Sequence, residues 1–239
     1  MEIPTELIDR ARARHGTVVL PEGEDERIVT AARRLADQGL ARPVVLGPPD
    51  AVSAVAARAG VSLDGISLVD PATSARREAY ATLYAAGRSG AKANPGLAAR
   101  LMRKPLYYGA MMVRAGDADA VVAGAANPTR RVLEAGMLGI GPTPGIETPS
   151  SFFLMLVPRP GTTAGPAAGS GERRLIFADC ALNIDPDPAQ LADIAIASAA
   201  SARRLLDTAP RVALLSFSTR GSARHGHVEK VTQALEIAR

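Results

Sequence analysis

Short apolar runs alternate with segments of helical periodicity along the first half of this chain. The apolar, β-prone runs are residues 17–20, 43–46, 66–69 and 119–122. Between the first two runs, Ile28, Ala32 and Leu35 recur at helical spacing within 25–38, and Gly39 follows where a helix would end. Strands that alternate with helices of this length predict a parallel sheet with right-handed crossovers, and therefore an α/β fold.

Further helices are expected around these strands. They are residues 5–15, a helix capped by Asp50 that runs to about residue 58, residues 75–88, and residues 98–115, interrupted before Pro105 and closed by Gly116.

The organisation changes at 136–149, where G-M-L-G-I-G-P-T-P-G-I-E-T-P is dense in glycine and proline. Such a segment is typical of a crossing between domains. We therefore predict a first α/β domain over 1–143 and a second over 144–239.

The second domain is predicted to mix sheet types. Residues 151–157 and 175–178 read as an antiparallel pair joined by a flexible loop, followed by a helix over 187–206 and a buried strand over 212–215. A last helix is expected from about Ser222. If strands and helices keep alternating, another strand should follow this helix, so the second domain is expected to be incomplete.

The composition of the chain excludes several classes of protein. The 239 residues are 47% hydrophobic, enough for a sizeable core, and no uncharged apolar run reaches the length of a membrane span. With one cysteine, we expect a soluble, cytoplasmic protein. The arginines are scattered among acids and aromatics are 3%, so nucleic acid is not expected as a partner. No P-loop or dinucleotide-binding glycine pattern is present.

The segment L-S-F-S-T-R-G-S-A at 215–223 changes from an apolar run into hydroxyls, an arginine and a glycine just before a predicted helix. Hydroxyls and guanidinium bind oxyanions, and the free N–H groups of a helix N-terminus add partial positive charge. The segment therefore predicts a site for a phosphate-bearing ligand. Its candidate residues are Ser216, Ser218, Thr219, Arg220, Gly221 and Ser222.

A second junction, 121–131, has the same character, because an apolar strand is followed by Asn127, Arg130 and Arg131. Ligands of open α/β sheets lie outside the carboxyl ends of the strands, so the two junctions are expected to face each other across a cleft. For the two arginines the alternative is that they are solvated charges on the first turn of a helix.

Four other features admit a chemical and a structural interpretation. Cys180 is interpreted as a small buried side chain, and His225 and His227 lack further ligands at metal spacing, so no metal is expected. Asp179 either points into the cleft or caps the turn that follows it. The acids of 21–27 are interpreted as first-turn charges that suit the helix dipole.

Six motifs occur in a fixed order along nearly the whole chain. They are P-E-G-E-D-E-R (21–27), D-A-D-A-V-V-A-G-A (117–125), S-S-F-F-L-M (150–155), F-A-D-C-A-L-N (177–183), L-A-D-I-A-I-A-S-A (191–199) and V-A-L-L-S-F-S-T-R-G-S-A (212–223). Together they closely resemble the phosphate acetyltransferase and butyryltransferase family. Several long motifs in order are more specific than any single glycine pattern.

The resemblance implies transfer of an acetyl group between coenzyme A and inorganic phosphate, giving acetyl phosphate and CoA, with no metal or redox cofactor. It also implies a homodimer with the architecture of isocitrate and isopropylmalate dehydrogenases, which has two α/β domains. The reaction needs a base for the thiol, cations and hydroxyls for phosphate, and donors for the tetrahedral oxyanion. Arg88 sits where the family carries an arginine implicated in CoA binding.

The chain departs from the family pattern in two places. Glu134 stands where many members have an arginine, and Arg130 with Arg131 can substitute for it. The family's later I-D-G-E-L-Q and N-D-L-S-R-G segments, which carry the presumed catalytic residues, are absent from this sequence. Catalytic residues therefore stay unassigned. The alternatives are a non-catalytic acetyl-CoA-binding domain, an inactive fragment, or butyryl specificity.

Overall fold

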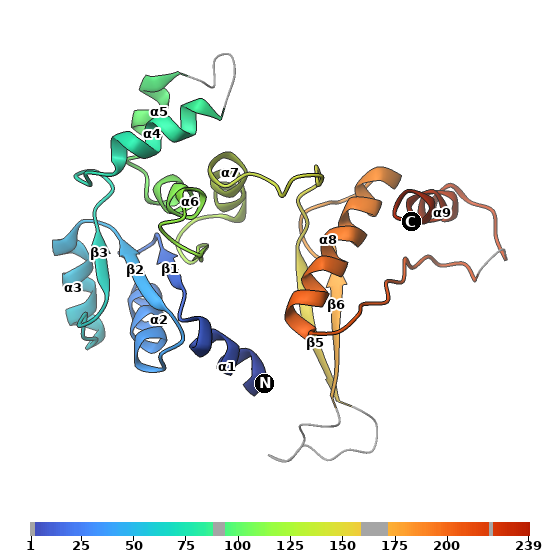
Figure 1. Cartoon of the computed structure of the whole chain (residues 1–239), viewed down its shortest axis with the longest axis horizontal. Helices are drawn as coiled ribbons and strands as arrows, with labels where there is room; N and C mark the ends of the chain where they lie inside the picture. Colours follow the sequence, from blue (N-terminus) through green and yellow to red (C-terminus); the bar gives the residue numbers. More distant parts are fainter. Residues whose placement is uncertain (1–2, 88–93, 159–171, 220–221) are drawn as a thin grey trace. The chain divides into compact units, whose positions relative to one another are not determined.

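The structure is a computed structural model that describes residues 3–87, 94–158, 172–219 and 222–239 (Figure 1). The chain divides into two units, Met1–Gly141 and Pro142–Arg239, and each is described by itself. Among the described helices, none combines the length and the apolar composition needed to cross a membrane.

The first unit is built on a four-stranded parallel sheet, which confirms the predicted α/β class. Its strands are β1 (Thr17–Leu20), β2 (Arg42–Leu46), β3 (Ser67–Val69) and β4 (Ala120–Val121), in the spatial order β3-β2-β1-β4. The strand order reverses between β1 and β4. In open α/β sheets this reversal, at the carboxyl ends of the strands, is where ligands bind.

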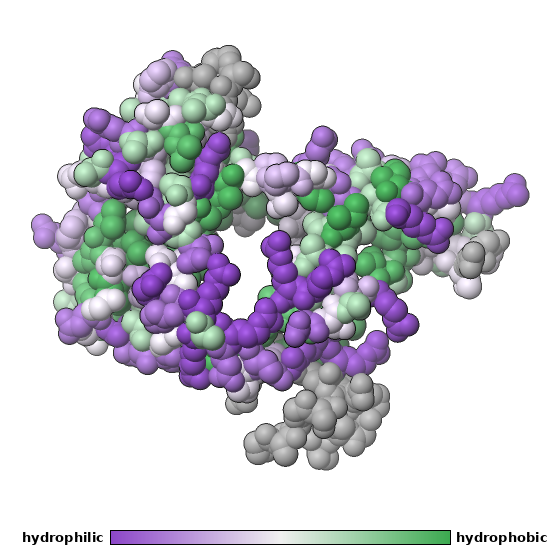
Figure 2. Space-filling view, in the orientation of Figure 1, coloured by the Kyte–Doolittle hydropathy of each residue, from purple (hydrophilic) through white to green (hydrophobic). Residues whose placement is uncertain are grey.

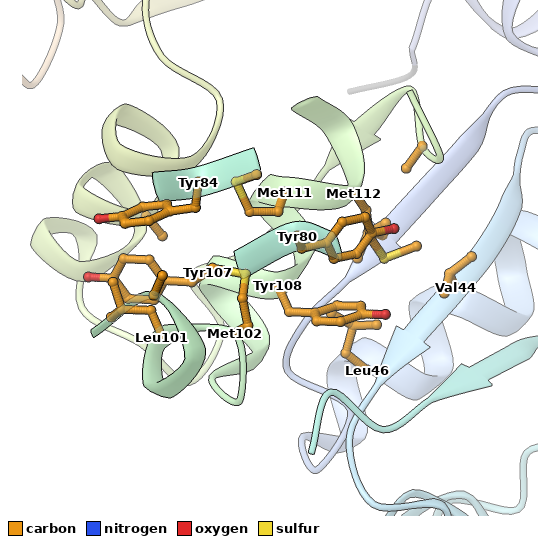
Figure 3. Close-up of a cluster of buried hydrophobic side chains, with 14 residues drawn as sticks. Val44, Leu46, Tyr80, Tyr84, Leu101, Met102, Tyr107, Tyr108, Met111 and Met112 are labelled. Atoms are coloured by element: carbon orange, nitrogen blue, oxygen red, sulfur yellow. The ribbon is translucent and has the colours of Figure 1, made fainter. Parts of the chain in front are cut away.

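Successive side chains of a strand point to opposite faces of the sheet, so these apolar strands present apolar residues on both faces. Helices cover both faces. Leu20 and Val45 pack with apolar residues of α2 (Glu26–Asp37) and α3 (Pro49–Ala59). Val19, Val44 and Leu46 face a second cluster that contains Tyr80, Tyr84, Tyr108 and Met111 (Figure 3). The helices of that second layer are α4 (Arg77–Ala86), α5 (Pro95–Leu101), α6 (Pro105–Ala115) and α7 (Thr129–Gly139). The remaining helix, α1 (Thr5–Arg14), precedes β1.

Two predictions for the first unit are wrong in detail. Asp50 lies inside α3, which has Pro48 as its N-cap and begins at Pro49, since proline is preorganised for the first helical position. The expected crossing at 136–149 also begins too early, because α7 continues to Gly139, which packs against α6.

The second unit contains an antiparallel pair, β5 (Phe152–Pro158) and β6 (Glu172–Ala178), as the sequence predicts. The long helix α8 (Pro188–Leu206) packs on β6 and begins at a capping box in which the Asp187 side chain accepts from the Gln190 N–H. The last helix is α9 (Gly226–Ile237), which packs against α8. Figure 2 shows apolar residues at the surface beside these two helices. Ile196 of α8 and Leu235 and Ile237 of α9 are exposed apolar residues.

The predicted strand at 212–215 is wrong. These residues form no strand, and the Leu215 side chain is 83% exposed. An apolar run becomes a buried strand only beside a hydrogen-bonding neighbour, and the sheet of the described second unit consists of β5 and β6 alone. The helix expected from Ser222 begins instead at Gly226, where the Nδ1 of His225 accepts the His227 N–H.

Candidate functional site

A cavity of about 660 Å³ lies at the carboxyl edge of the parallel sheet. Residues just after β1 and β2 line it, together with the loop after β4, the first turns of α7 and the junction between α5 and α6. Its volume falls in the range of small-molecule sites, and its position beside the reversal of strand order is where such folds bind ligands. All of its lining residues belong to the first unit.

The cavity wall contains a buried acid, Glu22, which is 6% exposed. Its Oε2 accepts hydrogen bonds from the N–H groups of Gly124 and Ala125, both at 2.8 Å. Its Oε1 accepts from the N–H of Ala126 at 3.0 Å and from the N–H and Nδ2 of Asn127, both at 2.8 Å. One carboxylate therefore closes the loop that follows β4.

Glu22 is ionised in this setting. Burial alone raises the pKa of a carboxyl group, but the hydrogen bonds from Asn127 and the loop amides outweigh burial and lower the pKa of Glu22. The interpretation of all acids in 21–27 as helix-dipole charges is thus wrong for Glu22. Asp25 is the residue that caps α2, since its Oδ1 accepts the Arg27 N–H at 2.9 Å.

Positive charge in the cavity comes from Arg131, on the first turn of α7, and from Lys104, which precedes α6. The Nζ of Lys104 lies 6.0 Å from the ring centroid of Tyr107. Burial and a hydrogen bond with Glu134 raise the pKa of Tyr107 to about 12, so its hydroxyl is protonated at neutral pH. The cavity lining thus holds two cations, a neutral phenol and four acids, which are Glu22, Glu24, Asp25 and Glu134.

In the second unit, the predicted anion site is only partly described, and it stays a prediction. Ser216, Thr219 and Ser222 are exposed, and the hydroxyls of the segment bond within it. The Ser218 and Ser222 hydroxyls lie 2.9 Å apart, and the Ser222 hydroxyl donates to the Thr219 carbonyl at 2.6 Å. Arg220 and Gly221 lie outside the described residues.

The hydrogen bonds of Asp179 agree with the interpretation that it caps the turn that follows it. Its Oδ1 accepts from the Ser151 N–H at 2.8 Å and hydroxyl at 2.6 Å, and its Oδ2 accepts from the N–H groups of Leu182 and Asn183. Cys180 is half-buried, and its Sγ donates to the Ser151 hydroxyl at 3.2 Å. Across the described residues, no group of three or more His, Cys, Asp and Glu side chains is arranged to hold a metal ion.

Comparison with known proteins decides the family. The model of the family described as "Phosphate acetyl/butaryl transferase" matches residues 3–239. The chain belongs to this family.

Relatives within the family are enzymes named phosphate acetyltransferase. The chain is 40% identical to that of Paracoccus denitrificans over 231 residues, and 36% identical to that of Acetivibrio thermocellus over 241 residues. These matches cover 97% and 100% of the chain and 67% and 69% of the relatives, so the chain spans about two thirds of their length.

Solved structures within the family agree with the fold. A phosphotransacetylase from Streptococcus pyogenes superposes with a TM-score of 0.84 at 34% identity, covering 100% of this chain and 69% of that chain. The EutD phosphotransacetylase from Staphylococcus aureus gives a TM-score of 0.81 at 33% identity, covering 98% and 68%.

Two of the binding residues predicted from the sequence of this family member line the cavity. They are Asn127, whose side chain already donates to Glu22, and Arg131. Arg130 is exposed on the same turn and does not belong to the cavity lining, and Arg88 lies outside the described residues.

Sequence reasoning missed Lys104, Tyr107 and the anchoring role of Glu22. Two features of the sequence could have singled out Lys104, because it is one of three lysines in the chain and precedes a proline at a helix start. No feature of the sequence indicates the role of Glu22, since its partners are about a hundred residues away along the chain.

Proposed function

We propose that the chain takes part in the transfer of an acetyl group between coenzyme A and inorganic phosphate. The relatives named phosphate acetyltransferase support this assignment, and so does the family match over residues 3–239. The observation that carries the proposal in the structure is the cavity at the sheet edge, where Arg131 and Lys104 supply positive charge for an oxyanion.

The reaction makes defined demands on the site. A phosphate oxygen attacks the carbonyl carbon of the thioester, a C–O bond forms, and the C–S bond breaks as CoA leaves and takes up a proton. Cations stabilise the phosphate and the oxyanion of the tetrahedral intermediate. Arg131 and Lys104 are the cations that line the described cavity. We assign no general base.

With this function we propose the domain division 1–143 and 144–239 and an architecture like that of isocitrate and isopropylmalate dehydrogenases. The parallel order β3-β2-β1-β4 supports the α/β part of this proposal. A homodimer and a cytoplasmic location are proposed with it from the family resemblance and the single cysteine. Coenzyme A enters as a substrate, and we propose no metal or redox cofactor.

The test is acetyl phosphate formation from acetyl-CoA and phosphate, combined with calorimetric titration of CoA and phosphate into the purified chain. Turnover that depends on both substrates supports the proposed activity, and replacing acetyl-CoA with butyryl-CoA measures the acyl preference. Binding of CoA without turnover favours the non-catalytic acetyl-CoA-binding domain instead. Absence of both turnover and binding would contradict the proposal.

A further inference from the structure

The loop that follows β4 is held by an acid from a distant part of the chain. We infer that Glu22 is a positioning residue, whose ionised carboxylate fixes the loop 124–127 and, through it, Asn127 and the first turn of α7 at the cavity. The effect on ligand binding rests on the proposed function, whereas the effect on the loop does not.

The geometry of the loop explains why a carboxylate is needed. Four consecutive N–H groups, from Gly124 to Asn127, point to the two oxygens of one side chain. Gly124 has a φ of +116°, a backbone conformation that other residues rarely adopt, which allows the peptide groups to turn toward the same point. The arrangement is an amide nest, which favours an anion.

The opposite side of the loop is held as well. The Ala125 carbonyl accepts a hydrogen bond from Nη2 of Arg27, and the same guanidinium pairs with Asp25 at 2.7 Å. The loop after β4 is therefore fixed on its N–H side by Glu22 and on its carbonyl side by Arg27. Both come from the segment that follows β1.

Charge and hydrogen-bonding type both matter at Glu22. An ionised carboxylate only accepts hydrogen bonds, which suits a site with five N–H donors. A glutamine of the same size would turn an NH₂ group toward some of these donors and would carry no charge. Glu22→Gln therefore tests the carboxylate and not the volume of the side chain.

The position of the loop sets the position of cavity residues. α7 begins at Thr129, two residues after Asn127, and carries Arg131 and Glu134 into the cavity lining. A small displacement of a charged group that contacts substrate costs a large factor in rate. Loss of the Glu22 carboxylate should therefore affect ligand binding through the position of the loop and of Arg131.

Hydrogen–deuterium exchange tests the loop directly. In Glu22→Gln and Glu22→Ala, we expect amide exchange over residues 124–131 to rise roughly tenfold or more, because the N–H groups lose their acceptor. Glu26→Gln is the matched control, since Glu26 is an exposed acid of the same segment outside the cavity. Val19→Ala is the control for general destabilisation, because Val19 is fully buried in the sheet.

Formate separates positioning from a general loss of packing. Added formate should enter the vacated nest of Glu22→Ala and restore protection at 124–131, whereas chloride at the same ionic strength should not. Formate should leave Val19→Ala unchanged. Wild-type-like exchange in Glu22→Gln, a uniform increase like that of Val19→Ala, or no response of Glu22→Ala to formate would each overturn the inference.

Ligand binding provides the second readout. In Glu22→Gln, the KM or Kd for phosphate should rise roughly tenfold, with a smaller change in kcat, and formate should partly restore it in Glu22→Ala. If the wild-type chain binds neither CoA nor phosphate, the proposed function fails while the exchange measurements still decide the role of Glu22. If phosphate binding is unchanged in both variants although the loop is loosened, the positioning role is wrong.

Discussion

Gly139 on α7 faces Ala110 on α6 so closely that a Cβ added to Gly139 would lie 2.5 Å from the Cβ of Ala110. Gly139→Ala should therefore force the two helices apart and destabilise the first unit by roughly 1–3 kcal/mol. Thermal melting followed by tyrosine emission measures this, because all four tyrosines lie at positions 80 to 108 and the chain has no tryptophan.

The control for Gly139→Ala lies on the same helix. Gly136 has open space where a Cβ would be built, and its backbone is helical. Gly136→Ala should stabilise the unit by roughly 0.5–1 kcal/mol, since alanine has the higher helix propensity. Equal effects of the two substitutions would show that the α6–α7 contact does not depend on glycine.

Asp117 gives the first unit a dependence on acid pH. Its carboxylate accepts two hydrogen bonds from Arg76, at 2.8 and 2.6 Å, and one from the Tyr80 hydroxyl at 2.5 Å. These bonds hold the pKa of Asp117 below its ordinary value near 3.8, so the stabilisation is complete above that value and is lost as the pH falls toward the folded pKa.

Asp117→Asn should lower the melting temperature at neutral pH and flatten its decline below about pH 4. Melts at a series of pH values measure both effects. Asp37→Asn, which removes a more exposed partner of Arg33, is the control and should change the melting temperature little. An unchanged acid decline in Asp117→Asn would assign the pH dependence to other groups.

Asp179 should be the most sensitive acid of the second unit. Burial raises its pKa, but hydrogen bonds from Ser151, Asn183 and Leu182 outweigh burial and hold the pKa well below the ordinary value. Asp179→Asn leaves some of these donors without an acceptor and should cost roughly 2 kcal/mol. Denaturant unfolding followed by circular dichroism measures the loss.

The matched control for Asp179→Asn is Asp185→Asn. Asp185 is an exposed acid whose partner is Lys230, and such surface pairs contribute little. A cost for Asp185→Asn as large as that for Asp179→Asn would contradict the capping role of Asp179.

The sequence predicts the first unit well because burial there follows the period of each element. Val45 faces one core cluster while Val44 and Leu46 face the other, so β2 reads as a continuous apolar run typical of a strand covered on both faces. The run at 212–215 is also continuously apolar and forms no strand, because a pattern of residue types does not specify a hydrogen-bonding neighbour.

The candidate site is less visible in the sequence. Arg131 and Asn127 are found because they lie around the junction between β4 and α7, at the edge where ligands bind. The role of Glu22 is not predicted, because a carboxylate that binds the backbone amides of a distant loop produces no recognisable pattern in the sequence. Lys104 and Tyr107 reach the cavity from the α5–α6 junction, which no strand precedes directly.

The Tyr107 hydroxyl should lose its proton at a higher pH than that of an ordinary tyrosine. Burial and the hydrogen bond with Glu134 raise its pKa to about 12, because a carboxylate that accepts from the phenol disfavours the phenolate. Burial and the bond with Asp117 also raise the pKa of Tyr80, so ultraviolet titration near 295 nm should show a late component that becomes smaller in Tyr107→Phe and does not vanish. Glu134→Gln should move that component toward lower pH, and a shift in the opposite direction would contradict the assigned contact.

Arg131 and Arg130 are adjacent arginines with different expected roles. Both side chains are exposed, but Arg131 lines the cavity and Arg130 lies outside its lining. If Arg131 binds an anionic group, Arg131→Ala removes a charge-assisted hydrogen bond and should weaken phosphate or CoA binding roughly 10- to 100-fold. Arg130→Ala removes the same charge at nearly the same place and should change binding by less than about threefold, because Arg130 lies outside the cavity lining and its charge acts on the cavity only through solvent. Calorimetry at low and moderate salt compares the two variants. Equal losses would assign the effect to general positive charge on α7, and no loss in either variant would remove Arg131 from the ligand site.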